Sequence, residues 1–230
     1  MNNNRINLKR MWLISALILA IMGALSAWGW LQVPADVSIP VHWGIDGTPD
    51  RYGGKAEGLL MLPLVTLGIA LLFTLILYID PLRTNIMQSG KAYTITWTVL
   101  LLFMAALHLF VVLFTLGWVE NTNLIFSLGV GMLFLILGNY MGKIRRNYTF
   151  GIKTPWTLAS DHVWDKTHRL GGKLFVLAGL LMLIGAFLPG MFQLYLMLGS
   201  LFGVIAVVMG YSYLVWRNDV AGQQSAGNRK

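Results

Sequence analysis

Long runs of apolar residues dominate this chain, and six of them are long enough to cross a lipid bilayer as helices. A membrane-spanning helix needs roughly 20 mainly apolar residues, because each residue adds about 1.5 Å against a hydrocarbon thickness of about 30 Å. The pattern therefore predicts an all-α polytopic membrane protein with six transmembrane helices. They cover approximately residues 11–31, 59–78, 94–117, 124–142, 174–189 and 192–216.

The polar segment between the first two runs, residues 32–58, has a pattern of its own. Apolar and polar residues alternate over residues 37–43, which is typical of a short strand. Asp46-Gly47 and Pro49-Asp50 follow, and both pairs favour turns because glycine tolerates positive φ and proline presets a bend. The segment is therefore predicted to form a small structured loop.

The polar segment between the fourth and fifth runs, residues 143–173, contains helix signals. Ser160 is a favourable N-cap, Lys166 and Arg169 lie toward a helix end, and Gly171 is suited to closing a helix. Apolar and cationic residues fall on different faces at helical spacing. The sequence thus predicts a short amphipathic helix lying against the membrane.

The composition supports a lipid environment and the charges predict an orientation. Apolar residues make up 57% of the chain and charged residues only 11%, whereas soluble domains carry about 25% charge. Fifteen of the 17 Lys and Arg residues lie on one side of the predicted spans, and only Arg51 and Lys55 lie on the other. The positive-inside rule then places both termini and residues 143–173 on the cytoplasmic side of a bacterial inner membrane. The net charge of +8 is thus a topology signal, and we expect no direct nucleic-acid binding.

Few polar residues lie within the predicted spans, and none is Asp, Glu, Lys or Arg at a span centre. His108 is expected to form a hydrogen bond across the bundle. An alternative is a small-solute or lipid transporter whose path passes near His108. Gly131 and the Gly199-x-x-x-Gly203 motif are expected to allow close helix packing.

The sequence offers two weak constellations for metal or acid–base chemistry. His42, Asp46 and Asp50 share the outer loop, and a second set, Asp161, Asp165 and His168, has helical spacing. Neither matches a standard ligand motif, and the chain has no cysteine. We therefore expect no enzyme activity, no metal and no cofactor, and keep a membrane enzyme acting at the headgroup level as an alternative.

Two motifs carry a resemblance to a known family. The inner segment contains Asn147-Tyr148-x-x-Gly151-Ile152-Lys153-Thr154-Pro155-Trp156-Thr157-Leu158, followed by Val163-Trp164-x-Lys166-Thr167-His168-Arg169-x-Gly171-Gly172, and the outer loop contains Pro40-x-His42-Trp43 and Gly47-x-Pro49-Asp50-x-x-Gly53-x-Lys55. The inner motif resembles the SdpI family of integral membrane proteins. The outer motif is similar to a small uncharacterised domain that commonly precedes it. The resemblance divides the chain into residues 1–93, with the extracytoplasmic loop 32–58, and a four-helix core of residues 94–230.

The resemblance implies an immunity or signalling protein that protects its cell against a secreted peptide toxin. In the type system of the family, such a protein also holds a transcriptional repressor at the membrane, so a cytoplasmic repressor or other protein is an expected partner beside the lipid bilayer. The candidate residues of the cytoplasmic loop are Asn147, Gly151, Lys153, Thr154, Pro155, Trp156, Trp164, Lys166, His168 and Arg169. Those of the outer loop are His42, Trp43, Asp46, Asp50 and Arg51.

Overall fold

The computed structural model describes residues 6–44 and 46–227 and contains six long helices. Each is long and apolar enough to cross a membrane, which confirms the six predicted spans. They are α1 (Leu8–Gln32), α2 (Lys55–Ile79), α4 (Gly90–Thr115), α5 (Thr122–Met141), α7 (Asp161–Gly185) and α8 (Gly190–Gly227).

Four short elements lie between the long helices. Strands β1 (Ile39–Trp43) and β2 (Pro49–Gly53) form an antiparallel hairpin, whose turn includes Gly47 at a φ of +81°. The strand predicted from the alternating pattern is therefore confirmed. The short helices α3 (Arg83–Gln88) and α6 (Pro155–Ala159) were not predicted.

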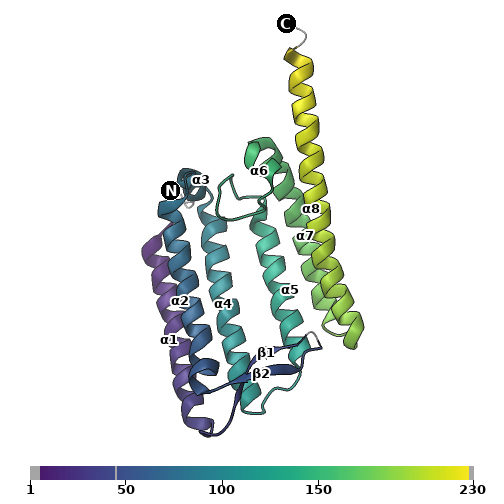
Figure 1. Cartoon of the computed structure of the whole chain (residues 1–230). Helices are drawn as coiled ribbons and strands as arrows, with labels where there is room; N and C mark the ends of the chain where they lie inside the picture. The colour runs from purple at the N-terminus through teal and green to yellow at the C-terminus, as the bar shows by residue number, and fades with distance from the viewer. Residues whose placement is uncertain (1–5, 45, 228–230) are drawn as a thin grey trace.

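The long helices run side by side, so that the molecule has two polar ends (Figure 1). We call the end with both termini, α3 and α6 the terminal face, and the end covered by β1 and β2 the hairpin face. Helix α8 has 38 residues, or about 57 Å at 1.5 Å per residue, and projects beyond the terminal face.

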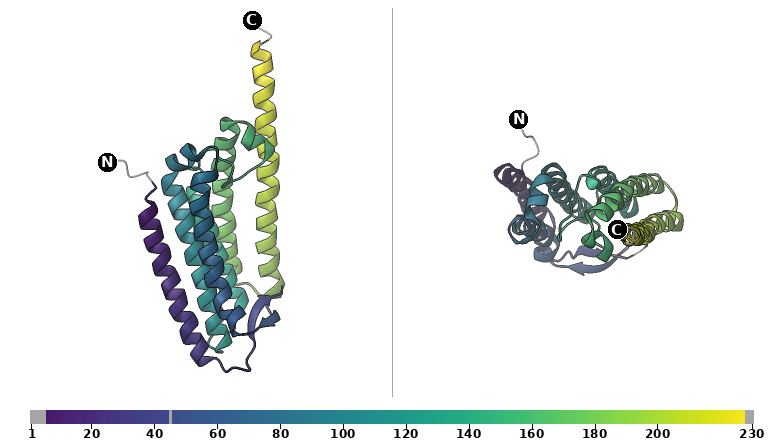
Figure 2. Two further views of the ribbon diagram at one scale, coloured as in Figure 1. Left: turned by 60° about the vertical axis from the view of Figure 1, so that its left-hand side comes forward. Right: turned by 90° about the horizontal axis from the view of Figure 1, so that it is seen from above.

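The bundle consists of two groups of three helices (Figure 2). Helices α1, α2 and α4 pack against one another, while α7 packs against both α5 and α8. Contacts between α4 and α5 join the groups. The division between residues 93 and 94 stays a prediction, and α4 packs against helices on both sides of it.

Glycines allow α5 and α7 to approach closely. A Cβ atom built on Gly138 would lie 2.7 Å from the carbonyl oxygen of Gly172, and one built on Gly172 would lie 2.7 Å from that of Gly138. Gly131 and Gly179 face each other similarly, which confirms close packing at Gly131. Such contacts are typical of membrane helices, where small residues let backbones meet.

The Gly199-x-x-x-Gly203 motif has a different environment. A Cβ atom at Gly199 or Gly203 would meet no atom within 4 Å among the residues that the structure describes. The motif therefore does not serve packing within this part of the chain.

The prediction of a separate amphipathic helix ending at Gly171 is wrong. Helix α7 begins after the N-cap Ser160, as predicted, but continues without a break to Gly185. Gly171 and Gly172 are buried, because Gly171 faces Ile152 and Gly172 faces α5. Tertiary packing thus carries the helix through two residues that favour an end in isolation. The connecting segment is residues 142–160, shorter than the predicted 143–173.

His108 joins all three helices of the first group. Its Nε2 atom lies 2.9 Å from Ser26 Oγ of α1, and this hydroxyl donates to the carbonyl oxygen of Leu59 in α2 at 2.7 Å. Both His108 and Ser26 are buried. The expected hydrogen bond across the bundle is therefore confirmed.

We expect Ser26→Ala to lower the free energy of unfolding by about 0.6–1.7 kcal/mol, which runs from the average to the largest value measured for hydrogen bonds between membrane helices. The alanine leaves Nε2 of His108 without this partner, while the helix itself keeps its backbone bonds. Unfolding of the purified protein in detergent measures the change. Ser200→Ala is the matched control, because Ser200 Oγ donates to Met197 of its own helix. Equal losses in both variants would contradict this role.

Candidate functional site

Residues 142–160 fold into a compact segment on the terminal face, and Asn147 is at its centre. The Asn147 side chain is fully buried. Its Oδ1 atom accepts hydrogen bonds from the backbone N–H groups of Thr149 and Phe150 at 2.9 and 2.8 Å, and its Nδ2 atom donates to the carbonyl oxygen of Arg145. Asn147 therefore shapes a turn, and both its amide oxygen and its amide nitrogen bond to the backbone.

Three residues near α3 anchor this segment to the first group of helices. Asp80 accepts hydrogen bonds from the backbone N–H of Tyr148 and the hydroxyl of Thr149 at 3.0 and 2.8 Å. Asn85 donates to the carbonyl oxygen of Arg146, and Ser89 Oγ accepts from the backbone N–H of Arg145. None of these three residues was predicted from the sequence.

His168 and Trp164 form the support beneath Gly151. His168 Nδ1 lies 2.9 Å from the carbonyl oxygen of Trp164, so Nδ1 carries the proton and Nε2 accepts the backbone N–H of Ile152. The two rings stack with centroids 4.0 Å apart, and Trp164 Nε1 donates to the carbonyl oxygen of Ile144. Gly151 has a φ of +113°, and a Cβ atom there would lie 2.6 Å from His168 Nε2. Only glycine fits this position.

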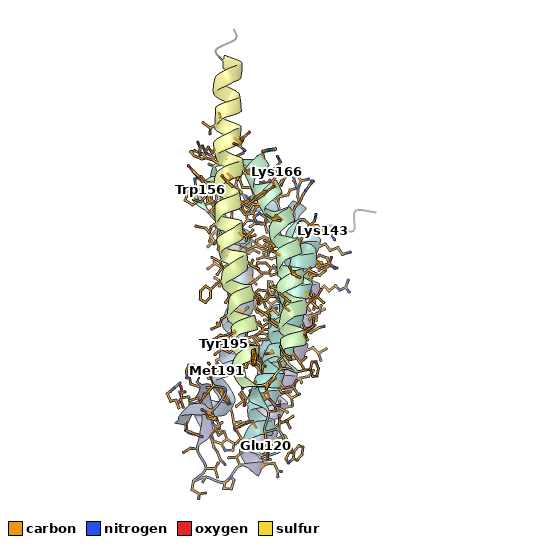
Figure 3. All side chains as sticks on the ribbon, turned by 90° about the vertical axis from the view of Figure 1, so that its right-hand side faces the viewer. Glu120, Lys143, Trp156, Lys166, Met191 and Tyr195 are labelled. Carbon is orange, nitrogen blue, oxygen red and sulfur yellow. The ribbon has the colours of Figure 1, made fainter. Side chains whose placement is uncertain are left out.

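The threonines of the motif cap helix α6 and join it to α8. Thr154 is the N-cap and forms a reciprocal capping box with Thr157. Pro155 occupies the first helical turn, where its missing N–H costs no hydrogen bond. The Thr154 hydroxyl lies 3.2 Å from that of Ser212, and Trp156 packs edge-on against Tyr213. Figure 3 shows Trp156 at this end of the molecule with Lys143 and Lys166.

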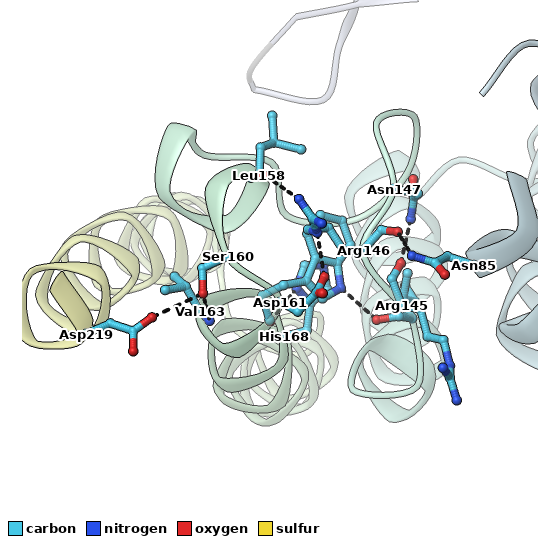
Figure 4. A network of polar contacts seen from close by, with 12 residues as sticks. Asn85, Arg145, Arg146, Asn147, Leu158, Ser160, Asp161, Val163, His168 and Asp219 are labelled. Atoms are coloured by element: carbon cyan, nitrogen blue, oxygen red, sulfur yellow. Dashed lines mark hydrogen bonds and ion pairs between the residues drawn. The ribbon is translucent and has the colours of Figure 1, made fainter. Parts of the chain in front are cut away.

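A polar network fixes the start of α7 (Figure 4). Arg146 bonds both the carboxylate of Asp161 and the carbonyl oxygen of Leu158. The hydroxyl of Ser160 lies 3.2 Å from a carboxylate oxygen of Asp219 in α8. The network ties the segment to the projecting part of α8.

The structure does not assemble Asp161, Asp165 and His168 into an acid–base site. His168 is buried and both of its ring nitrogens have backbone partners, whereas Asp161 and Asp165 are exposed. Within residues 6–44 and 46–227, no three His, Asp or Glu side chains gather as a metal-binding group. Of the predicted inner residues, Lys153, Pro155, Trp156, Lys166 and Arg169 keep solvent-accessible side chains, since each is exposed or partly exposed.

On the hairpin face, four of the predicted residues have partners within the loop or the adjoining helix. Asp46 accepts hydrogen bonds from the backbone N–H and the hydroxyl of Thr48, and these bonds lower the pKa of its carboxyl group. Arg51 pairs with Glu57 at 2.7 Å. His42 Nδ1 lies 2.6 Å from Asp50 Oδ1, and this pair is exposed.

Trp43 is the predicted outer-loop residue that lines two cavities at the hairpin, whereas His42 and Asp46 line one each. An apolar cavity of about 320 Å³ lies between the hairpin and helices α2, α4 and α5, and a second of about 280 Å³ lies between the hairpin and the starts of α5 and α8. Trp43 lines both. Its indole N–H is buried and has no hydrogen-bond partner among the described residues. The hairpin face thus offers apolar space beside an unused donor.

Comparisons with known proteins agree with this arrangement. Residues 143–213 match the SdpI/YfhL protein family, and residues 17–67 match a domain of unknown function, DUF1648. The chain is 29% identical over 178 residues to the immunity protein SdpI of Bacillus subtilis strain 168, covering 76% of this chain and 83% of that protein. No solved structure matches. The chain is thus a multi-pass membrane protein in which residues 143–213 resemble the SdpI/YfhL family and a DUF1648 region precedes them.

Proposed function

We propose that this protein is a non-enzymatic immunity protein that protects a bacterial cell against a secreted peptide toxin. The similarity to an immunity protein along most of both chains carries this proposal. The terminal face supports a non-enzymatic role, because Asn147, Thr157 and His168, which are buried polar residues of its motif, all bond to the backbone.

The proposal includes an orientation in which both termini are cytoplasmic and the hairpin face is outside. The distribution of Lys and Arg supports it, since Arg51 and Lys55 are the two cations of the sequence on the hairpin side of the spans. A secreted peptide then arrives at the cavities around Trp43. An apolar side chain of the toxin fits the 320 Å³ cavity, and a peptide carbonyl oxygen is a suitable acceptor for the free indole N–H.

Filling the 320 Å³ cavity tests the proposal. A toxin-sensitive host expresses the wild type and is challenged with peptides secreted by Bacillus subtilis strain 168, the source of the similar immunity protein. We expect the wild type to raise the tolerated dose. We expect Val65→Trp to lower that protection about tenfold, because Val65 lines the cavity and a bulky ring there excludes a side chain of the toxin. Such a side chain contributes about 1.4 kcal/mol or more of binding free energy.

Leu64→Trp is the matched control, because Leu64 is 65% exposed and does not line this cavity. Membrane levels of all variants are compared by immunoblot. Absence of protection by a correctly inserted wild type would refute the immunity function. Full protection by Val65→Trp would agree with an immunity function but would show that the hairpin-face cavity is not needed for it.

We propose a second contact, with a cytoplasmic protein, at the terminal face. The support is that Lys153, Trp156 and Lys166 are accessible on a segment fixed by buried bonds. A rigid surface with an aromatic residue and cations suits a protein partner. Capture of one cytoplasmic protein by the wild type and by Lys173→Ala, but not by Lys166→Ala, is the expected result.

A further inference from the structure

A polar cleft of about 490 Å³ opens on the terminal face between the end of α5 and the start of α7, beside α3. It is separate from the hairpin-face cavities and from the Gly151 support. Its charged lining residues are Lys143, Arg145, Arg146, Arg169, Asp161 and Asp165.

The cleft has an excess of unpaired positive charge. Arg146 is held by Asp161 and by the carbonyl oxygen of Leu158. Lys143, Arg145 and Arg169 have no carboxylate partner in the part of the chain that the structure describes, where Asp165 is the other acid of the lining. Three free cations against one free carboxylate favour an anion.

The residues around the cleft indicate how deep in the membrane it lies. Helix α5 ends at Met141, so Lys143 lies just beyond the span. The Lys143 ammonium group lies 4.6 Å from the ring centre of Tyr140, and that of Lys91 lies 5.9 Å from it. A tyrosine between cations at a span end is typical of the lipid headgroup layer.

We propose that this cleft binds the phosphate group of an anionic phospholipid. Arginine guanidinium groups match phosphate oxygens in pairs, and Lys143 adds a point charge. Arg146, which already bonds Asp161, keeps the edge of the cleft in position. The inference does not depend on immunity or on the orientation of the chain, because phospholipid headgroups line both membrane surfaces.

Lipid retention by the purified full chain tests the proposal. The protein in detergent is titrated with phosphatidylglycerol or phosphatidylcholine, and bound lipid is counted by native mass spectrometry. We expect wild-type protein to prefer phosphatidylglycerol, and Arg145→Gln with Arg169→Gln to lose about thirtyfold in affinity, since each cation contributes about fivefold at a membrane surface. The preference is expected to weaken as salt rises.

Lys153→Gln with Lys166→Gln is the matched control. It removes the same charge from the same two parts of the chain, residues 142–160 and the start of α7, but outside the cleft, and we expect less than about a threefold change. Unfolding temperatures are measured in parallel. If the double cleft variant does not fold, Arg169→Gln alone replaces it, because Arg169 is exposed.

Four results would overturn the proposal. The first is equal retention of both lipids, and the second is a preference that survives in the cleft variant. The third is a soluble ligand: cleft-dependent binding of glycerol 3-phosphate as tight as that of phosphatidylglycerol would assign the site to a free phosphate ester. Cleft-dependent binding of a polyglutamate peptide without lipid selectivity would assign it to an acidic protein. Displacement of phosphatidylglycerol only by much higher glycerol 3-phosphate supports the lipid.

Discussion

Replacing Gly138 by leucine is expected to separate α5 from α7 and to abolish the stable fold of the second helix group. The new Cβ atom would lie 2.7 Å from the carbonyl oxygen of Gly172 and 2.8 Å from the backbone nitrogen of Val176. These are backbone atoms, which cannot rotate aside as a side chain does. The loss should therefore exceed the usual overpacking cost of about 1–3 kcal/mol.

Thermal unfolding of the purified protein in detergent measures this loss. Gly203→Leu is the matched control, since a Cβ atom there meets nothing within 4 Å in the described structure. Both variants gain roughly 0.8–1 kcal/mol of helix propensity over glycine, so their difference isolates the clash. Equal unfolding temperatures for the two variants would show that α5 and α7 do not pack through Gly138.

Trp164→Ala is expected to have the second largest effect, a loss of about 3–5 kcal/mol, the range for deleting a fully buried aromatic side chain. Trp164 is 0% exposed, stacks on His168 and donates to the carbonyl oxygen of Ile144. Its removal leaves a cavity and a carbonyl oxygen without its donor. The unfolding temperature should fall by about 10 °C for a chain of this size, and residues 142–160 should become sensitive to protease.

Trp156→Ala serves as the comparison on the same segment. Trp156 is partly exposed and packs on Tyr213, so its loss should cost less than about half as much. Rapid cleavage of residues 142–160 in Trp164→Ala, with a resistant Trp156→Ala, would agree with the structure. The reverse order would mean that Trp156 is the residue that holds the segment.

The membrane architecture was predictable because the bilayer requires long apolar runs, and such runs are visible in any window of the sequence. The β1 strand was predictable from alternation over residues 37–43. The continuity of α7 was not, because Gly171 and Gly172 favour a helix end locally. Only their contacts with Ile152 and α5 show that a glycine there allows close packing. Local signals cannot reveal such partners, which are distant in sequence.

The candidate site shows a related limit. Asn147, Thr154 and His168 are polar and stand in a specific motif, which suggests recognition. In the structure they are buried, and their hydrogen bonds shape the backbone of residues 142–160. Asp80 also shapes this backbone, although it lies 67 positions before Asn147. The sequence signal that marks it is the Asp80-Pro81 pair directly after an apolar run.

The grouping of the helices into two sets of three has a consequence for how such chains are assembled from parts. A unit with an odd number of membrane crossings delivers the following polypeptide to the opposite side. Helices α1, α2 and α4 form such a unit by packing, and they determine the side from which α5 enters. A chain without them would carry residues 142–160, which hold four Lys and Arg residues, to the other compartment, against the tendency of cations to stay inside. We therefore do not expect either set of three helices to keep its orientation when it is fused alone to another membrane protein. The two sets together have an even number of helices and should keep it.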